Sequence, residues 1–286
     1  MKSCHPLAGV VRWVNERDLA IGVRLVAPAA PGPEGDGWIR ADRLPERVPD
    51  LIALLAERSC SGHRTAAAAF LAIDVGRQVL CFASVSAYLT GRAPQLAADR
   101  FWVRHDENGR VVEAAFRQGA AAVLAGDPMS ARPGVLPVRG DRELDEWFVA
   151  GAVAVLEPVV EAVRAHTRFG ARAQWDRISD APFEALLRGA EEVGADQAGA
   201  WRRAHRIASC LNRDRKRVEL RQRPFPLALA GRPGHRPERT FLVRAGCCFY
   251  YRFADTMCAG CPINDDDSRE QALRAAHEPT ALAARD

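Results

Sequence analysis

The chain has 286 residues, 48% hydrophobic and 27% charged, a composition that suits one large globular domain or two smaller ones. The formal net charge of +4 is mild, so charge alone predicts binding to neither nucleic acid nor a membrane surface. No uninterrupted apolar run of roughly eighteen residues occurs, so we expect no membrane span. The N-terminal stretch lacks the features of a secretory signal, and we expect a cytoplasmic protein with reduced thiols.

The N-terminal part of the chain predicts a few strands followed by long helices. Residues 10–14, 19–27 and 38–40 are rich in β-branched and aromatic side chains, which indicates a short β region. The pattern then becomes helical, because residues 50–60 and 64–89 are rich in Ala and Leu and continue without a break signal.

A β-hairpin is predicted in the middle of the chain, over residues 100–116. Its two β-rich runs are separated at Asn108 and Gly109, a pair that tolerates the positive φ of a tight turn. A second helical block begins at Asp141, where apolar residues recur at helical spacing. Pro158 is expected to end, kink or restart that helix. Further helices are predicted at 181–193 and 198–220.

The C-terminal part changes character. Residues 221–240 are rich in Pro, Gly and Arg, which predicts a linker. A short strand is expected within residues 240–253. Ser268 and Gln271 form a capping-box signal for a closing helix over 269–278.

These elements predict an α+β fold that is predominantly helical, with a short N-terminal β region, a central β-hairpin and a small C-terminal segment. We expect residues 1–235 to form the mainly helical, substrate-binding body and residues 236–286 to form the C-terminal segment. A single compact domain with an appended motif and two true domains both fit this pattern.

Four of the eight cysteines gather near the C-terminus, at Cys247, Cys248, Cys258 and Cys261. In a reducing compartment such a cluster indicates metal binding rather than disulfides. Thiolates are soft ligands that suit zinc and iron–sulfur clusters. Neither the paired Cys-x-x-Cys knuckles of a zinc ribbon nor the plant-type ferredoxin spacing is present, so ligand chemistry leaves both groups open.

The spacing of the cysteines makes demands on the backbone. Neighbouring side chains of a strand point to opposite faces, so Cys247 and Cys248 can share one site only if the chain bends there. Gly246 is the expected place for that bend. Gly260 is expected to give turn freedom between Cys258 and Cys261.

The segment RAGCCFYYRFADTMCAGCPI, residues 244–263, resembles the C-terminal motif of FhuF-type ferric-siderophore reductases. Those proteins hold a [2Fe–2S] cluster with a Cys-Cys pair and a Cys-x-x-Cys-Pro sequence, accompanied by an Arg and aromatic residues. Residues 156–181 also resemble a segment of that family, which is related to the helical C-terminal part of siderophore synthetases. The resemblance implies that the cluster ligands are Cys247, Cys248, Cys258 and Cys261.

The function implied by this resemblance is reduction of siderophore-bound Fe(III) by one electron from the cluster, which releases Fe(II) in the cytoplasm. The electron is expected from a separate ferredoxin or flavoprotein, because no Gly-rich nucleotide fingerprint follows a strand. No catalytic residue is predicted beyond the cluster. Two alternatives remain: a binding or regulatory protein with a structural Cys4 zinc site, and an iron- or redox-sensing regulator. Neither a nucleic-acid partner nor a membrane span is predicted.

The remaining cysteines and the aromatic residues receive simpler predictions. The scattered Cys4, Cys60, Cys81 and Cys210 are expected to be small buried apolar residues. The aromatic residues after the cysteine pair are expected to pack around the cluster and limit water: Phe249, Tyr250, Tyr251 and Phe253.

A basic stretch lies between the helical body and the cysteine segment. We expect it to be a solvated helix face, with docking of an anionic siderophore or electron donor as the alternative. Its cationic residues are Arg213, Arg215, Lys216, Arg217, Arg221 and Arg223.

Overall fold

The computed structural model describes residues 5–17, 19, 21–213, 220–229, 238–254 and 256–278. Helices dominate and the strands form small sheets, which confirms the predicted α+β class. The α-helices in the described part of the chain are α1 (Ala8–Asn15), α2 (Leu44–Ser59), α3 (Arg64–Thr90), α4 (Asp141–His166), α5 (Ala171–Ile178), α6 (Ala181–Glu192), α7 (Gln197–Leu211) and α8 (Asp266–His277).

The strands form three sheets. The four-stranded sheet has the order β1-β5-β4-β2 and combines a parallel β1–β5 pair with antiparallel neighbours. A second sheet has the order β3-β6-β7, and β8 pairs with β9 alone. The strands are β1 (Gly22–Val26), β2 (Trp38–Arg40), β3 (Arg92–Pro94), β4 (Phe101–His105), β5 (Val111–Arg117), β6 (Ala121–Leu124), β7 (Val135–Val138), β8 (Arg223–Ala228) and β9 (Glu238–Val243).

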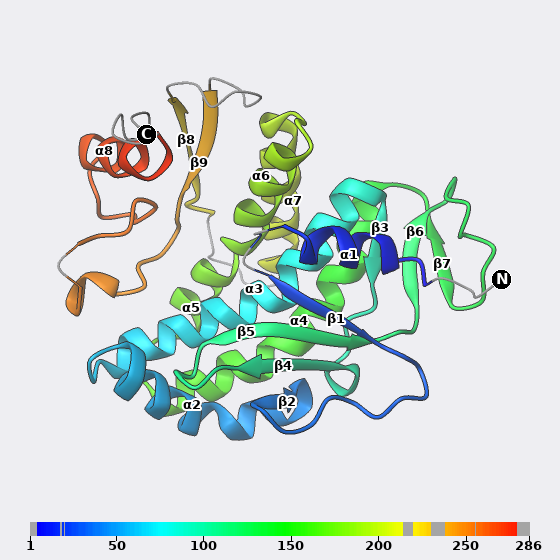
Figure 1. The fold of residues 1–286 in the computed structure, drawn as a ribbon, viewed down its shortest axis with the longest axis horizontal. Coiled ribbons are helices and arrows are strands. Elements are labelled where there is room, and N and C mark those ends of the chain that lie inside the picture. Colours follow the sequence, from blue (N-terminus) through cyan, green and yellow to red (C-terminus); the bar gives the residue numbers. More distant parts are fainter. Residues whose placement is uncertain are drawn as a thin grey trace, which may run out of the picture.

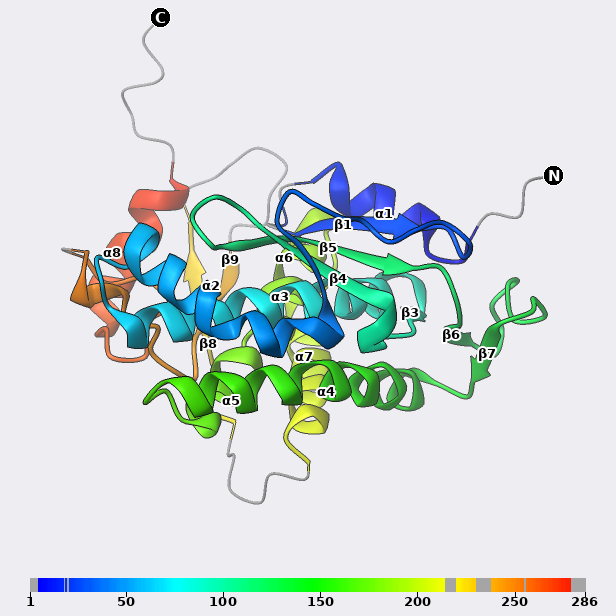
Figure 2. The same ribbon diagram turned by 90° about the horizontal axis from the view of Figure 1, so that it is seen from below.

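Helix α3 is the centre of the main core. It lies between the four-stranded sheet and the helices α4, α5 and α7 (Figure 2), packs against α6 as well, and is buried on nearly all sides. A helix that is apolar all round is buried in a core or spans a membrane. By length and composition α3 could cross a membrane, but 89% of its apolar window is buried inside this fold, as is common for core helices.

The predicted hairpin is confirmed. Strands β4 and β5 pair antiparallel, with Phe101 opposite Phe116, and Gly109 in the connecting turn has a φ of +80°. The predicted strands at 19–27 and 38–40 correspond to β1 and β2.

The strand predicted at residues 10–14 is wrong, because these residues belong to α1. The β-branched residues there favour a strand locally. However, Val10, Val11 and Val14 lie on one side of α1, where all three are buried. The helical arrangement buries this apolar side, and tertiary packing outweighs the local preference.

The linker predicted at residues 221–240 is also wrong in part, because it contains β8. Pro224 and Pro226 alternate along β8, opposite Leu242 and Thr240 of β9. Proline is tolerated in an edge strand when its missing N–H faces away from the ladder. Because Pro224 and Pro226 are typical of loops, the sequence pattern predicted a linker where the structure has a strand.

Helix boundaries differ from the sequence expectations in three places. Helix α2 begins at Leu44, with Pro49 inside it, and α4 continues through Pro158. The closing helix α8 is capped by Asp265, whose side chain accepts the backbone N–H of Ser268, so Ser268 is not the cap.

The basic stretch is only partly described. Arg213 pairs with Glu146, and Arg223 pairs with Asp266. The helix predicted at 198–220 corresponds to α7, which ends at Leu211. Residues 214–219 lie outside the described residues, and these include Arg215, Lys216 and Arg217.

The hairpin β8–β9 and helix α8 form a C-terminal lobe at one end of the molecule, beside α6 (Figure 1). The lobe has a small core of its own, made of Phe225, Leu227, Val243 and Leu273. The expected boundary at residue 235 falls between β8 and β9, which pair with each other.

Gly151 of α4 packs where no side chain fits. A Cβ at this position would lie 2.6 Å from the backbone carbonyl oxygen of Leu96, whereas a Cβ at Gly9 of α1 would meet nothing within 4 Å. We expect Gly151→Ala to lower the free energy of unfolding by about 1–3 kcal/mol, because the overpacked backbone must move. Gly9→Ala is the control and should raise it by about 0.5–1 kcal/mol. Urea titration of both variants tests this, and equal effects would contradict the packing argument.

Candidate metal centre

The loop between β9 and α8 brings the four predicted cysteines together. The side chain of Cys247 is within hydrogen-bonding reach of Cys261, and Cys248 is within reach of Cys258. Each thiol of the adjacent pair therefore meets one thiol of the Cys-x-x-Cys turn. Among the described residues, however, no three His, Cys, Asp or Glu side chains already form a ligand group for one ion, and every described cysteine is free. The sulfurs are neighbours arranged as two pairs.

The chain bends at Ala245 and Gly246, directly before the cysteine pair, as predicted, and Phe249 just after the pair adds a second change of direction. Phe249 has a φ of +60°, a conformation that is rare for a bulky residue and that occurs mainly at functional sites. The bend lets the Phe249 N–H donate to the Cys247 sulfur at 3.2 Å, and the backbone of Tyr250 hydrogen-bonds Cys248. Both sulfurs thus receive backbone hydrogen bonds from the residues that follow them.

Glycine is needed at Gly246 and Gly260 because other groups approach closely. A Cβ at Gly246 would lie 2.9 Å from Cδ of Arg177, and a Cβ at Gly260 would lie 2.9 Å from the Leu242 carbonyl oxygen. Gly246 lies in the predicted bend and Gly260 in the predicted turn between Cys258 and Cys261, but neither glycine has a positive φ. They let Arg177 and Arg244 lie against the cysteine loop.

The buried ion pair of Arg177 and Asp180 anchors this loop to the body. The two side chains are almost fully buried and are joined by a hydrogen bond from Nη1 of Arg177. Asp180 also accepts the backbone N–H of Ala245 at 3.0 Å and the side chain of Gln222. Nε of Arg177 is buried and finds no partner among the described residues. A donor group therefore remains available beside Gly246.

Arginine side chains also interact with the cysteine sulfurs. Arg244 donates from Nη1 to the Cys258 sulfur at 3.3 Å. The Cys258 thiol, helped by Arg177 and Arg244, lowers the pKa of Cys248 to about 5 despite burial. The same contact raises the pKa of Cys258, and burial raises that of Cys247. Within the hydrogen-bonded pair of Cys248 and Cys258, the thiolate is therefore favoured at Cys248.

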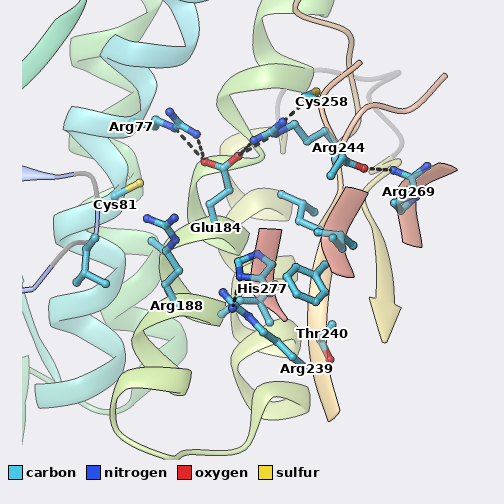
Figure 3. A pocket seen from close by; sticks show the side chains of 18 of the residues that line it. Arg77, Cys81, Glu184, Arg188, Arg239, Thr240, Arg244, Cys258, Arg269 and His277 are labelled. Atoms are coloured by element: carbon cyan, nitrogen blue, oxygen red, sulfur yellow. Dashed lines mark hydrogen bonds and ion pairs between the residues drawn. The ribbon is translucent and has the colours of Figure 1, made fainter. Parts of the chain in front are cut away.

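A cavity of about 460 Å³ adjoins the cysteine loop, and Cys258 lines it. It lies between the body helices α3 and α6 on one side and the C-terminal lobe on the other (Figure 3). Glu184 lines the cavity and lies between two arginines, 2.6 Å from Arg77 and 2.9 Å from Arg244. Burial opposes ionisation of Glu184, but Arg244 and Arg77 lower its pKa to about 2. The carboxylate is therefore charged at neutral pH and orients Arg244 toward Cys258.

The other cysteines occupy varied positions. Cys60 and Cys81 are buried, as expected, whereas Cys210 is only half-buried and Cys4 lies outside the described residues. Cys60 is also near enough to Cys248 to interact with it electrostatically. Cys81 donates to the Ala181 carbonyl oxygen and lines the cavity.

The aromatic residues of the loop divide into two groups. Phe249 packs edge-on against Phe169, and Phe253 packs against Phe70, so both fix the loop to the body. Tyr250 and Tyr251 are instead exposed, at 37% and 38%. The cysteine loop therefore has one face packed on the protein and another that reaches solvent.

The chemistry of this loop fits an iron–sulfur cluster or zinc. The four donors are soft thiols, Arg177 has an unused buried N–H beside them, and Gly246 and Gly260 leave space that side chains would fill. Backbone and arginine N–H groups directed at sulfur are the contacts that tune iron–sulfur clusters. Neither a scan against protein-family models nor a search of curated proteins returns a match for this chain.

Sequence reasoning predicted the cysteines, and the family motif includes an arginine that matches Arg244, but the partners of Arg244 were missed. Arg77, Glu184 and Arg244 come from three distant parts of the chain, and no spacing rule joins them. Arg177 and Asp180 do fall within residues 156–181, the segment with a family resemblance. That resemblance is the only sequence signal that could have pointed to them.

Proposed function

We propose that this protein is a cytoplasmic ferric-siderophore reductase in which Cys247, Cys248, Cys258 and Cys261 hold a [2Fe–2S] cluster. When bound, the cluster would supply the single electron that converts siderophore-bound Fe(III) to Fe(II), an ion that hard oxygen ligands hold poorly. The electron would reach the protein from a separate ferredoxin or flavoprotein.

The observation that carries the proposal is the position of Cys258. Cys258 belongs to the four-cysteine loop and is also one of the residues that line the cavity, so a molecule in the cavity would lie close to a ligand of the proposed cluster. Arg244 connects the loop with the cavity, because it donates to the Cys258 sulfur and to Glu184, which lines the cavity. Phe249 and Phe253 pack the loop against the body and limit water on that side.

The protein's own residues then have distinct tasks. Hydrogen bonds to sulfur from Arg244 and from the Phe249 backbone stabilise negative charge there and so favour the reduced form. Asp180 fixes the start of the loop through Ala245. The exposed side of the loop, with Tyr250 and Tyr251, leaves an approach for an electron donor.

The direct test is a visible and electron paramagnetic resonance spectrum of protein purified without oxygen, with iron, sulfide and zinc analysis. We expect a red-brown protein that bleaches with dithionite and shows two irons and two sulfides per chain, as [2Fe–2S] requires. After removal of dithionite, the reduced protein should convert one equivalent of a ferric chelate to Fe(II). Colourless protein with stoichiometric zinc and no sulfide would instead establish the structural Cys4 site.

A further inference from the structure

One buried hydrogen-bond donor beside the cysteine loop is not used within the fold. Arg177 is only 3% exposed, and its Nη1 contacts Asp180, but its Nε has no hydrogen-bond partner among the described residues. The other unpartnered buried side-chain atoms in the described ranges are amide oxygens, a hydroxyl and a histidine nitrogen, all of which can accept. An arginine Nε can only donate. Because buried donors are nearly always paired, this one calls for an acceptor.

The fold holds this donor against the start of the cysteine loop. Cδ of Arg177, the atom bonded to Nε, lies so close to Gly246 that a Cβ there would be 2.9 Å away. Asp180 binds Nη1 of Arg177 and also accepts the Ala245 N–H at 3.0 Å. The guanidinium is thereby tied to the two residues that precede the cysteine pair. Arg177 also interacts electrostatically with Cys248.

The nearby carboxylate does not serve as the acceptor of this N–H. Asp180 is bound by Nη1 of Arg177, by the Ala245 N–H and by the side chain of Gln222, and none of these contacts uses Nε. A [2Fe–2S] cluster on the four cysteines would supply the missing acceptors, because its thiolate and sulfide atoms carry negative charge. N–H groups directed at such sulfur atoms are one means by which proteins tune a cluster.

We propose that the Nε–H of Arg177 donates to a sulfur atom of the cluster and so raises its reduction potential. This inference rests on the cluster of the proposed function. The hydrogen bond stabilises the negative charge of the added electron, which makes the cluster easier to reduce and a milder reductant. Arg177 therefore sets how strong an electron donor the protein needs and how firmly held a ferric ion it reduces.

Arginine labelled with nitrogen-15 at Nε alone gives a direct test in the unaltered protein. Pulsed electron paramagnetic resonance of the dithionite-reduced cluster should detect a coupling to this nitrogen, because a hydrogen bond to sulfur carries spin density to the donor atom. Arg244 does not account for such a coupling, since it donates to Cys258 from Nη1 while its Nε contacts Glu184. A fully loaded cluster without the coupling would overturn the inference, whether or not any variant folds.

Arg177→Lys removes the Nε–H and keeps the positive charge. Lysine has a methylene where arginine has Nε, and its ammonium lies near the position of Cζ, from which it can still pair with Asp180. The nitrogen-15 coupling should disappear in this variant. A redox titration followed by visible absorption should show about a tenfold weaker affinity for the electron, which is a fall of about 59 mV for a one-electron couple.

Arg203→Lys is the matched control. Arg203 is also buried and charged, but it pairs with Asp141 and Asp145 of α4 at 3.0 Å and 2.9 Å, not with the cysteine loop or its anchor. This variant makes the same change of side chain in another buried ion pair. It should keep the nitrogen-15 coupling and the reduction potential of the unaltered protein.

Gly246→Ala tests the position of Arg177 without changing its chemistry. The new Cβ would lie 2.9 Å from Cδ of Arg177, so the arginine side chain must move away from the loop. Gly246 does not have a positive φ, and alanine can adopt its backbone conformation. We expect a weaker nitrogen-15 coupling and a fall in potential in the same direction as in Arg177→Lys. An unchanged coupling and potential would contradict the inferred contact.

The outcomes separate this inference from the reductase proposal. Red-brown protein whose potential is the same with and without Arg177→Lys overturns the inference and leaves the reductase proposal standing. Equal falls in Arg177→Lys and Arg203→Lys would show a general effect of the substitution and overturn it as well. Colourless zinc protein overturns both proposals. A protein with the coupling and the shifted potential that reduces no ferric chelate would support the role of Arg177 and remove the reductase function.

Discussion

Cys258→Ser is expected to abolish cluster assembly and ferric-chelate reduction. The loss of an outer-shell partner already lowers metal affinity by roughly 10–100-fold, and the loss of a ligand should exceed this. The change also removes the sulfur that pairs with Cys248 and that accepts the Arg244 N–H. Iron and sulfide analysis of protein purified without oxygen, together with its visible spectrum, measures the effect.

Cys210→Ser is the matched control for this experiment. Cys210 is a half-buried thiol at the end of α7 and contacts Arg213 rather than the cysteine loop. The control should retain the iron, sulfide and colour of the unaltered protein. Full cluster content in Cys258→Ser, or equal losses in both variants, would contradict the assignment of Cys258 as a ligand.

Glu184→Gln is expected to lower the free energy of unfolding by about 3 kcal/mol at neutral pH, as when one partner of a buried ion pair is removed. The glutamine leaves Arg77 and Arg244 without their shared carboxylate, although both are mostly buried. Arg244 also loses the contact that directs it to Cys258. Urea titration measures the stability, and Glu143→Gln, which alters an exposed pair with Arg139, should change it little.

The pH dependence of this effect has a definite sign. The pKa of Glu184 falls from 4.5 to about 2 in the folded protein, so its contribution is fully present above pH 4.5 and is lost as the pH falls toward 2. A shift of this size corresponds to about 3 kcal/mol. The stability difference between the unaltered protein and Glu184→Gln should therefore shrink across that range. A difference that stays constant down to pH 2 would show that the carboxylate does not act through its charge.

The parts of the fold that sequence predicted are those governed by local rules. The long apolar helix α3 and the hairpin turn at Gly109 follow directly from composition and turn chemistry. By contrast, residues 10–14 form a helix because their apolar side is buried against the body, which no local preference reveals. The short strands β6 and β7 were missed because they have few residues and depend on pairing with each other.

The candidate site shows the same division. Cys258 and Cys261 lie close in sequence, so their spacing predicts a shared site in advance. The predicted bend at Gly246 is present, but sequence did not predict the strained, positive-φ conformation of Phe249 after the pair, which its surroundings hold in place. The cavity wall includes Arg77 and Glu184, which are far from the cysteines in sequence. Only tertiary packing brings them near the cysteine loop, so the sequence did not predict them.

The prolines of β8 have a consequence for how copies of this protein behave toward one another. An unpaired strand edge normally offers alternating donors and acceptors to which a second chain can add. On β8 the positions Pro224 and Pro226 have no N–H to offer. We therefore expect the edge of β8 to resist the addition of strands from other copies of the protein. The cysteine loop can then lie near solvent without aggregation through the neighbouring β8–β9 hairpin.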